Sequence, residues 1–311
     1  MRKAFLETPV PVLISTILLL CAAGVKAAHP QVAEAPFSQK QGKPLLSKSN
    51  PALALGDYLF GLQSYDEAIT EYKRFLFFHP DVPRASDAFH KIGLAYRSQR
   101  RWTEAIEAMN VAIQRTAEAE LKSERRIDLA VTMIASGDYS FALLELLKVS
   151  KRHPSGRLRQ RAIFLQGVAH LYMFNWKSAR QAFKAYFDAI PGSRPKAKMI
   201  DALFDEAIHR PQKSVTVARV LSTILPGAGQ TYVGDWKNGL NALVLNVLVG
   251  FVSVDAVLDK RYQDAVFSGV FLFLRYYLGN RYRAGEAAKQ FNDRSDRGHA
   301  AKILQALHSL N

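Results

Sequence analysis

Residues 88–113 read AFHKIGLAYRSQRRWTEAIEAMNVAI and contain two apolar stripes at helical spacing. The first stripe ends at Tyr96 and the second begins at Trp102, with Arg100 and Arg101 between them. Apolar residues that recur three and four positions apart are typical of amphipathic helices. This stretch therefore predicts two helices joined by a short polar turn.

The same pattern returns every 37 residues between residues 50 and 191. A fixed period of this length predicts a solenoid, in which each unit buries its apolar face against its neighbours. We expect small residues where the two helices of a unit cross closely. Four columns of like residues carry the pattern: Gly56, Gly93, Ala130 and Gly167; Ala68, Ala105, Ala142 and Ala179; Tyr65, Trp102, Tyr139 and Trp176; Tyr72, Met109, Leu146 and Phe183.

These columns resemble the tetratricopeptide repeat, which combines a small residue, a bulky residue three positions later, an aromatic before a second alanine and a closing proline. Pro80, Pro154 and Pro191 close three of the four units. The family's usual unit has about 34 residues, and the longer loops here make the units similar to those of bacterial envelope adaptor proteins. We expect an all-α fold, with a TPR-like α-solenoid of four 37-residue helix-turn-helix units and a capping helix in residues 51–212.

The first 50 residues precede the repeats and lack their pattern. Residues 1–27 predict an export signal, because Arg2 and Lys3 precede an apolar stretch and small residues surround a cleavage site. Cys21, the only cysteine, leaves lipid attachment after signal cleavage as an alternative. Residues 28–50 are rich in Pro, Ser and Gln without periodicity, which predicts a disordered linker.

Residues 213–283 are mostly apolar and predict a membrane domain. Two apolar runs, at about 238–258 and 263–280, are near the length that crosses a bilayer, so we expect a transmembrane α-helical hairpin. The apolar stretch at 217–225 is too short to cross and predicts an interfacial or re-entrant segment. Residues 284–311 predict a basic helical tail.

The segment between these apolar stretches is rich in glycine. It resembles a Pro-Gly-x-Gly-Gln-x-Tyr-x-Gly signature found in small bacterial membrane domains of uncharacterised function. The resemblance implies membrane location and no particular activity. A dinucleotide loop is excluded, because the βαβ pattern and the acidic residue it requires are missing. The turn motif consists of Pro226, Gly227, Gly229, Gln230, Tyr232 and Gly234.

Four polar residues interrupt the apolar runs. If the hairpin is symmetric about the bond between residues 260 and 261, Asn246 lies level with Arg275, and Asn241 with Asn280. Such a polar layer predicts a site for a lipid headgroup or for a partner's transmembrane segment. In the alternative interpretation, Arg275 extends to the interface and the asparagines form hydrogen bonds across the helices.

The tetratricopeptide resemblance implies that the first helices of the units line a concave groove. The groove lacks the lysine and asparagine clamp of that family, so we expect an amphipathic peptide rather than a free carboxyl terminus. A capping helix of the chain itself is the alternative occupant of its apolar second half. The predicted groove residues are Phe60, His90, Lys91, Leu94, Arg97, Ile127, Val131, Ile134, Phe164, Val168, Leu171 and Tyr172.

Composition limits the partners. The net charge of +15 favours an acidic partner or an anionic lipid bilayer. No nucleic-acid-binding motif is present, so nucleic acid is not expected. The eight histidines show no His-Glu-x-x-His pattern, and no nucleophile or phosphate-loop motif occurs. The sequence therefore predicts no metal, no cofactor and no catalytic residue.

These observations predict a non-catalytic adaptor that binds a protein or peptide partner. We expect it at the bacterial inner membrane, with the repeats on the periplasmic side. The basic tail opposes this orientation, because Lys and Arg favour the cytoplasmic side. One alternative is a membrane enzyme or transport component whose site contains Arg275, Asn246 and Gly227. Another is a lipidated assembly adaptor at the outer membrane.

Overall fold

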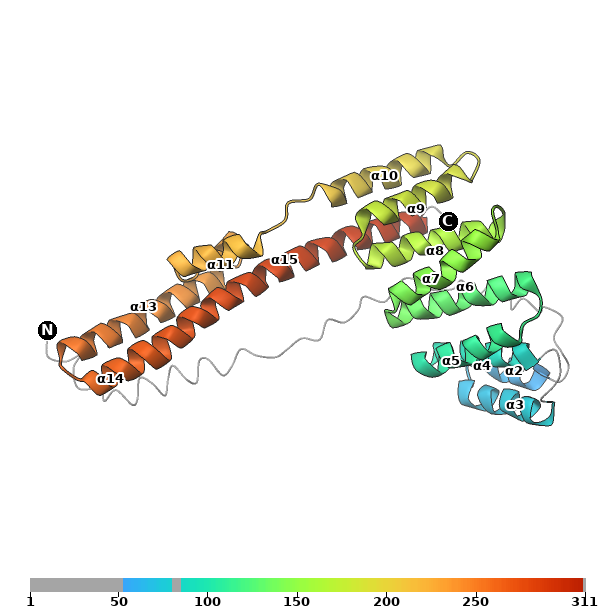
Figure 1. The fold of residues 1–311 in the computed structure, drawn as a ribbon, viewed down its shortest axis with the longest axis horizontal. Coiled ribbons are helices and arrows are strands. Elements are labelled where there is room, and N and C mark those ends of the chain that lie inside the picture. The colour runs from blue at the N-terminus through green and yellow to red at the C-terminus, as the bar shows by residue number, and fades with distance from the viewer. Residues whose placement is uncertain (1–52, 80–84, 310–311) are drawn as a thin grey trace. The chain divides into compact units, whose positions relative to one another are not determined.

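A computed structural model describes residues 53–79 and 85–309, and every regular element in these ranges is helical (Figure 1). The predicted export signal, Cys21 and the disordered linker lie outside the described residues. Eight helices form four consecutive pairs that match the predicted repeat units. The pairs are α2 (Ala54–Gly61) with α3 (Tyr65–Phe78), α4 (Ala85–Ser98) with α5 (Trp102–Arg115), α6 (Ala119–Ser136) with α7 (Tyr139–Arg152), and α8 (Arg157–Tyr172) with α9 (Trp176–Asp188).

The small and large columns of the repeat meet inside each pair. A methyl group added at Gly167 would lie 2.9 Å from the ring of Phe183, and Gly56 and Gly93 face Tyr72 and Met109 in the same way. A side chain at these glycines would therefore collide with the second helix of its own pair. The prediction that small residues permit a close helix crossing is confirmed.

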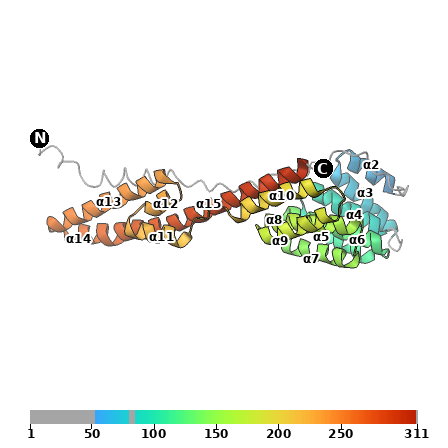
Figure 2. The ribbon, with the colours of Figure 1, turned by 90° about the horizontal axis from the view of Figure 1, so that it is seen from above.

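The chain continues beyond the fourth pair with more helices and no strand among the described residues. The predicted capping helix corresponds to α10, which packs against α9. The apolar helix α13 packs against a π-helical segment, η2, and against α15 (Figure 2). The elements are α10 (Arg194–Ile208), α11 (Val215–Ile224), α12 (Ala228–Tyr232), α13 (Trp236–Leu258), α14 (Tyr262–Val266), η2 (Phe267–Phe273) and α15 (Leu274–Ser309).

After α13 the chain turns back along α14, η2 and the start of α15, and we call this stretch the return arm. It differs from the expected separate transmembrane helix at 263–280, because it continues without a break as α15 to Ser309. The predicted tail is therefore the end of the same helix. No proline lies between Leu274 and Ser309, and Gly279, Gly285 and Gly298 are all accommodated within α15.

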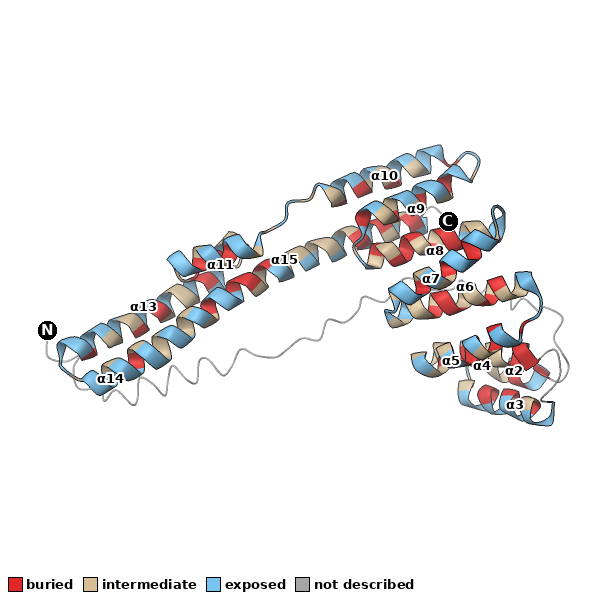
Figure 3. Ribbon diagram, in the orientation of Figure 1, coloured by how far each residue is buried: buried red, intermediate tan, exposed pale blue. Residues whose placement is uncertain are grey.

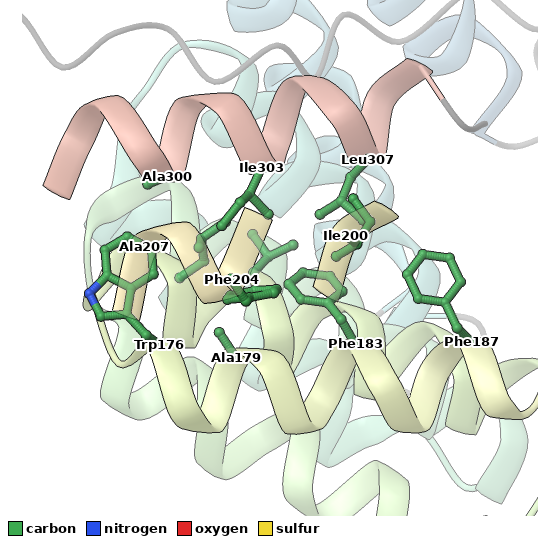
Figure 4. Packing of buried hydrophobic residues seen from close by; sticks show 12 residues of the cluster. Trp176, Ala179, Phe183, Phe187, Ile200, Phe204, Ala207, Ala300, Ile303 and Leu307 are labelled. Carbon is green, nitrogen blue, oxygen red and sulfur yellow. The ribbon is translucent and has the colours of Figure 1, made fainter. Parts of the chain in front are cut away.

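The end of α15 is buried against the repeats. Ala300, Ile303 and Leu307 share one hydrophobic cluster with residues of α9 and α10. In Figure 4, Ile303 and Leu307 point from α15 toward Phe204 and Phe183. The last pair of the array is thus closed by two helices, α10 and α15.

Only α13 among the described residues is long and apolar enough to cross a membrane. It has 23 residues and a mean hydropathy of 2.0 in its most apolar window, of which 17% is buried. In Figure 3, α13 is mostly in the colours of exposed and intermediate residues, whereas α8 is mostly in the colours of buried and intermediate residues. A core helix of a globular domain would be covered, so the apolar surface of α13 is unusual. The predicted hairpin of two transmembrane helices is not confirmed by this single helix.

Candidate functional site

The first helices of the pairs are linked by charges on one face. Lys91 of α4 forms an ion pair with Asp57 of α2, and the hydroxyl of Tyr72 donates to the same carboxylate at 2.8 Å. One pair along, His90 of α4 contacts Asp128 of α6 at 3.0 Å. Two residues predicted for the groove therefore join successive units: Lys91 contacts the first pair and His90 contacts the third pair.

Asp128 is the centre of this charged face, and sequence reasoning missed it. Burial alone would raise the pKa of its carboxyl, but the hydrogen bond from His90 and the charges of His90, Arg97 and Arg161 outweigh burial and lower that pKa. Burial also lowers the pKa of the Arg97 guanidinium, against the attraction of Asp128. A usable signal existed: Asp128 stands two residues before Ala130, as Lys91 stands two before Gly93.

Three of the predicted groove residues are buried, and the other nine keep partial exposure. Ile127, Val168 and Leu171 are buried, with exposed fractions of 0%, 1% and 0%. Seven of the partly exposed residues lie in the first three pairs. We call the first helix of a pair its A helix, and these seven residues the N-terminal A-helix face. This face consists of Phe60, His90, Lys91, Leu94, Arg97, Val131 and Ile134.

Two of the three buried residues belong to the fourth pair, whereas Ile127 of the third pair is buried among residues of α7 and α8. Val168 and Leu171 lie in the same cluster as Ile303 and Leu307 of α15. The other two predicted groove residues of the fourth pair make aromatic contacts. The ring centre of Phe164 lies 5.1 Å from that of Tyr186, and Tyr172 stacks on Tyr139 with ring centres 5.5 Å apart. The chain's own α15, in addition to the expected capping helix, therefore packs at the fourth-pair part of the predicted groove, while Val131 and Ile134 of the third pair keep partial exposure.

Ion pairs hold α15 and the segment after α10 together. Arg210 pairs with Asp296, and its guanidinium lies 5.1 Å from the centre of the Trp176 ring. Burial raises the pKa of Asp296 despite the neighbouring charges of Arg210 and His299. Glu206 of α10 contacts Lys302 at 2.9 Å and His299 at 3.4 Å. Charged side chains thus border the apolar contact of Figure 4.

The turn motif forms a compact junction between α11, α13 and α15. Gly227 has a left-handed backbone (φ 94°), and a side chain there would collide with the carbonyl of Gly239 at the start of α13. Gly229 faces Ala218 of α11 and Ala284 of α15. Two of the motif's glycines are therefore required by close backbone approach.

The polar residues of the motif also act in this junction. The Oγ of Ser222 donates to Gln230 at 3.1 Å, and the amide of Gln230 donates to the side chain of Asn280. Tyr232 accepts from the backbone N–H of Ser214 at 3.4 Å. Two further members lie at the edges: Pro226 is half-buried, and Gly234 ends the turn with φ 88°.

The expected polar layer is not formed. Asn280 bonds to Gln230 instead of lying against Asn241, which is exposed. Asn246 is buried and donates to the carbonyl of Ala242 in its own helix at 2.7 Å, while Arg275 is exposed. The two arms nevertheless run close to the expected alignment, since Gly250 lies beside Phe273 and Gly269 lies beside Ser253. Asn280 bonds outside the hairpin because α12 packs against α15 and provides its partner.

No group of three metal-ligating side chains occurs in the described ranges. The side-chain contacts described above between the first helices of successive pairs are ion pairs.

Comparison with known proteins found similar solved structures and one matching repeat. Among solved structures, the apo form of RapI aligns with a TM-score of 0.44 and 16% identity, covering 77% of this chain and 75% of RapI. A Rap protein complexed with competence and sporulation factor aligns with a TM-score of 0.35 and 14% identity, covering 82% of this chain and 74% of that chain. No curated protein sequence matches the chain. Residues 87–115, which form α4 and α5, match the tetratricopeptide repeat family, so the resemblance is confirmed for the second helix pair.

Proposed function

We propose that the protein is a non-catalytic adaptor that binds a protein or peptide partner on the N-terminal A-helix face. One observation carries the proposal: α15 joins the hydrophobic cluster of Val168 and Leu171 in the fourth pair, whereas seven predicted groove residues of the first three pairs keep partial exposure. An array that only supported its own tail would need no such surface.

The residues of this face indicate which kind of partner would bind there. Leu94, Val131 and Ile134 offer apolar contacts, and they share the face with His90 and the cations Lys91 and Arg97. Asp57 and Asp128 already balance part of that charge. The face therefore suits an amphipathic peptide with an apolar stripe and one or two carboxylates beside it.

The adaptor is proposed to be held at the bacterial inner membrane by α13 and the return arm. Support comes from the mostly uncovered apolar surface of α13 and from its length of 23 residues, which at about 1.5 Å per residue spans a hydrocarbon core. The export-signal pattern of residues 1–27 supports placing the repeats on the periplasmic side.

Site-specific photocrosslinking in intact cells tests the binding face. A photoreactive amino acid at Leu94 is expected to capture one defined protein, and Arg97→Glu should abolish that capture. Leu144 is the matched control, because it is an exposed leucine on the second helix of a pair. The same reagent at Phe164 should give a crosslink within the chain. Identical products from Leu94 and Leu144, or capture that survives Arg97→Glu, would contradict the proposal.

A further inference from the structure

The two ends of the hairpin formed by α13 and the return arm differ in charge. At the turn after α13, the guanidinium of Arg261 contacts Asp255 at 2.9 Å, Asp259 at 3.2 Å and Asp264 at 3.3 Å. Lys260 is the other cation of this turn. The turn therefore carries three carboxylates against two cations, and its arginine is already bound by acids.

The opposite end of the arm carries exposed cations. Lys237 lies in the first turn of α13, and Arg281 and Arg283 follow Asn280 on α15. These positions are at a similar level, because α12 packs on both helices and Gln230 of α12 bonds to Asn280. Successive helical residues point about 100° apart, so Arg281 and Arg283 project to different sides of α15.

Two aromatic side chains accompany these cations. Trp236 is 59% exposed and Tyr282 is 63% exposed. At helical spacing, Trp236 shares a face of α13 with the exposed Leu240 and Val244, and Tyr282 shares a face of α15 with the exposed Leu274 and Leu278. Exposed Trp and Tyr at the end of an apolar helix are typical of the level of lipid headgroups. An acidic protein or nucleic acid would require the cations but not this apolar and aromatic surround.

We propose that Lys237, Arg281 and Arg283 form a basic collar that binds the phosphate groups of anionic phospholipids at the membrane face nearest the repeats. The proposal rests on the membrane anchoring described above and adds a lipid class and a side. Each cation near an anionic surface favours binding by about fivefold. Three such cations give a marked preference for phosphatidylglycerol over a zwitterionic lipid, and added salt weakens it.

The test uses the full chain in bilayer nanodiscs of phosphatidylcholine and phosphatidylglycerol mixed at a known ratio. After partial removal of lipid by detergent, the lipids that remain with the protein are counted by mass spectrometry. The wild-type chain is expected to retain phosphatidylglycerol at several times its bulk proportion. The triple variant Lys237→Gln, Arg281→Gln, Arg283→Gln should retain the two lipids in bulk proportion.

Matched variants separate the collar from net charge. Lys151→Gln, Arg152→Gln and Lys177→Gln together remove three exposed cations from the repeats, and Lys260→Gln removes one from the turn; both should keep the enrichment. If the wild-type chain retains the two lipids in bulk proportion, or if the triple variant enriches phosphatidylglycerol as much as the wild type, the collar is overturned and the anchoring is not. A wild-type chain that stays in solution without detergent and leaves membranes in alkaline carbonate overturns the anchoring as well.

Discussion

At the scale of single residues, the turn inside each helix pair depends on one left-handed position. The four positions are Gln63 (φ 63°), Arg100 (φ 59°), Gly137 (φ 94°) and Phe174 (φ 55°), again 37 residues apart. A side chain at such a position strains the backbone even in open space, and Gly137 has no neighbour within 4 Å of an added Cβ. We expect Gly137→Ala to lower the free energy of unfolding by about 1 kcal/mol.

Gly61 provides the control for that substitution. It also has open surroundings, but it ends α2 with ordinary helical backbone. Gly61→Ala should be neutral or stabilise by about 0.5 kcal/mol. Urea unfolding of the full chain, followed by circular dichroism, measures both. Equal effects of the two variants would show that the left-handed backbone is not the cause.

Asp128 gives a pH-dependent prediction at the same scale. Its pKa in the folded chain lies below the ordinary value of 3.8, so its charge stabilises the fold above about pH 4 and this contribution is lost as pH falls through the folded pKa. Asp128→Asn should therefore destabilise by about 1.5 kcal/mol at pH 7. The difference from wild type should shrink below pH 4. Glu107→Gln, an exposed change on α5, should show neither effect.

At the scale of elements, α15 joins the repeats through a short apolar stripe. Ile303 is fully buried among residues of α9 and α10. Removing a buried isoleucine side chain to its β-carbon costs about 2–5 kcal/mol. Ile303→Ala should therefore release the end of α15 and make it sensitive to protease. Leu278→Ala, an exposed change on the same helix, should leave the protease pattern unaltered. Unchanged protection in Ile303→Ala would show that the docking is not needed to hold α15.

The helix pairs could be predicted from sequence, whereas the role of α15 could not. The contacts inside a pair join residues 16 positions apart, such as Gly167 and Phe183, so each unit repeats its own pattern. The partner of Ile303 is Phe204, about a hundred residues earlier, and such a contact leaves no period. The basic residues around it favoured a solvated tail. Ala300, Ile303 and Leu307 at helical spacing were the available signal.

The candidate site also has residues that could be predicted from the sequence and residues that could not. Lys91 and Arg97 could be placed on the A-helix face by counting from Gly93, because that face also follows the 37-residue period. The pairing of Gln230 with Asn280 could not be predicted, because it depends on how α12 sits between two later helices. The symmetry of a two-helix hairpin gave nearly the right alignment of its arms, but it could not give the partner of Asn280, which belongs to a third element.

At the scale of the whole molecule, the continuity of α15 constrains the membrane topology. One helix runs from the return arm to the contacts of Ile303 with the repeats. If α13 and the return arm cross the bilayer, the repeats and the end of α15 must lie on one side and the turn at Lys260 on the other. The proposed export of residues 1–27 places the repeats outside the cytoplasm, whereas the excess of Lys and Arg near the collar favours the opposite orientation.

Labelling of single cysteines in intact cells decides between these orientations. In a Cys21→Ser chain, Lys148→Cys on α7 and Gln290→Cys on α15 should react together with an impermeant maleimide, and Lys260→Cys should react only after the inner membrane is opened. A difference between positions 148 and 290 would contradict the shared side that α15 requires. Reaction at position 260 with protection of both others would keep the two crossings and move the repeats to the cytoplasm, because the charge rule would then outweigh the export signal.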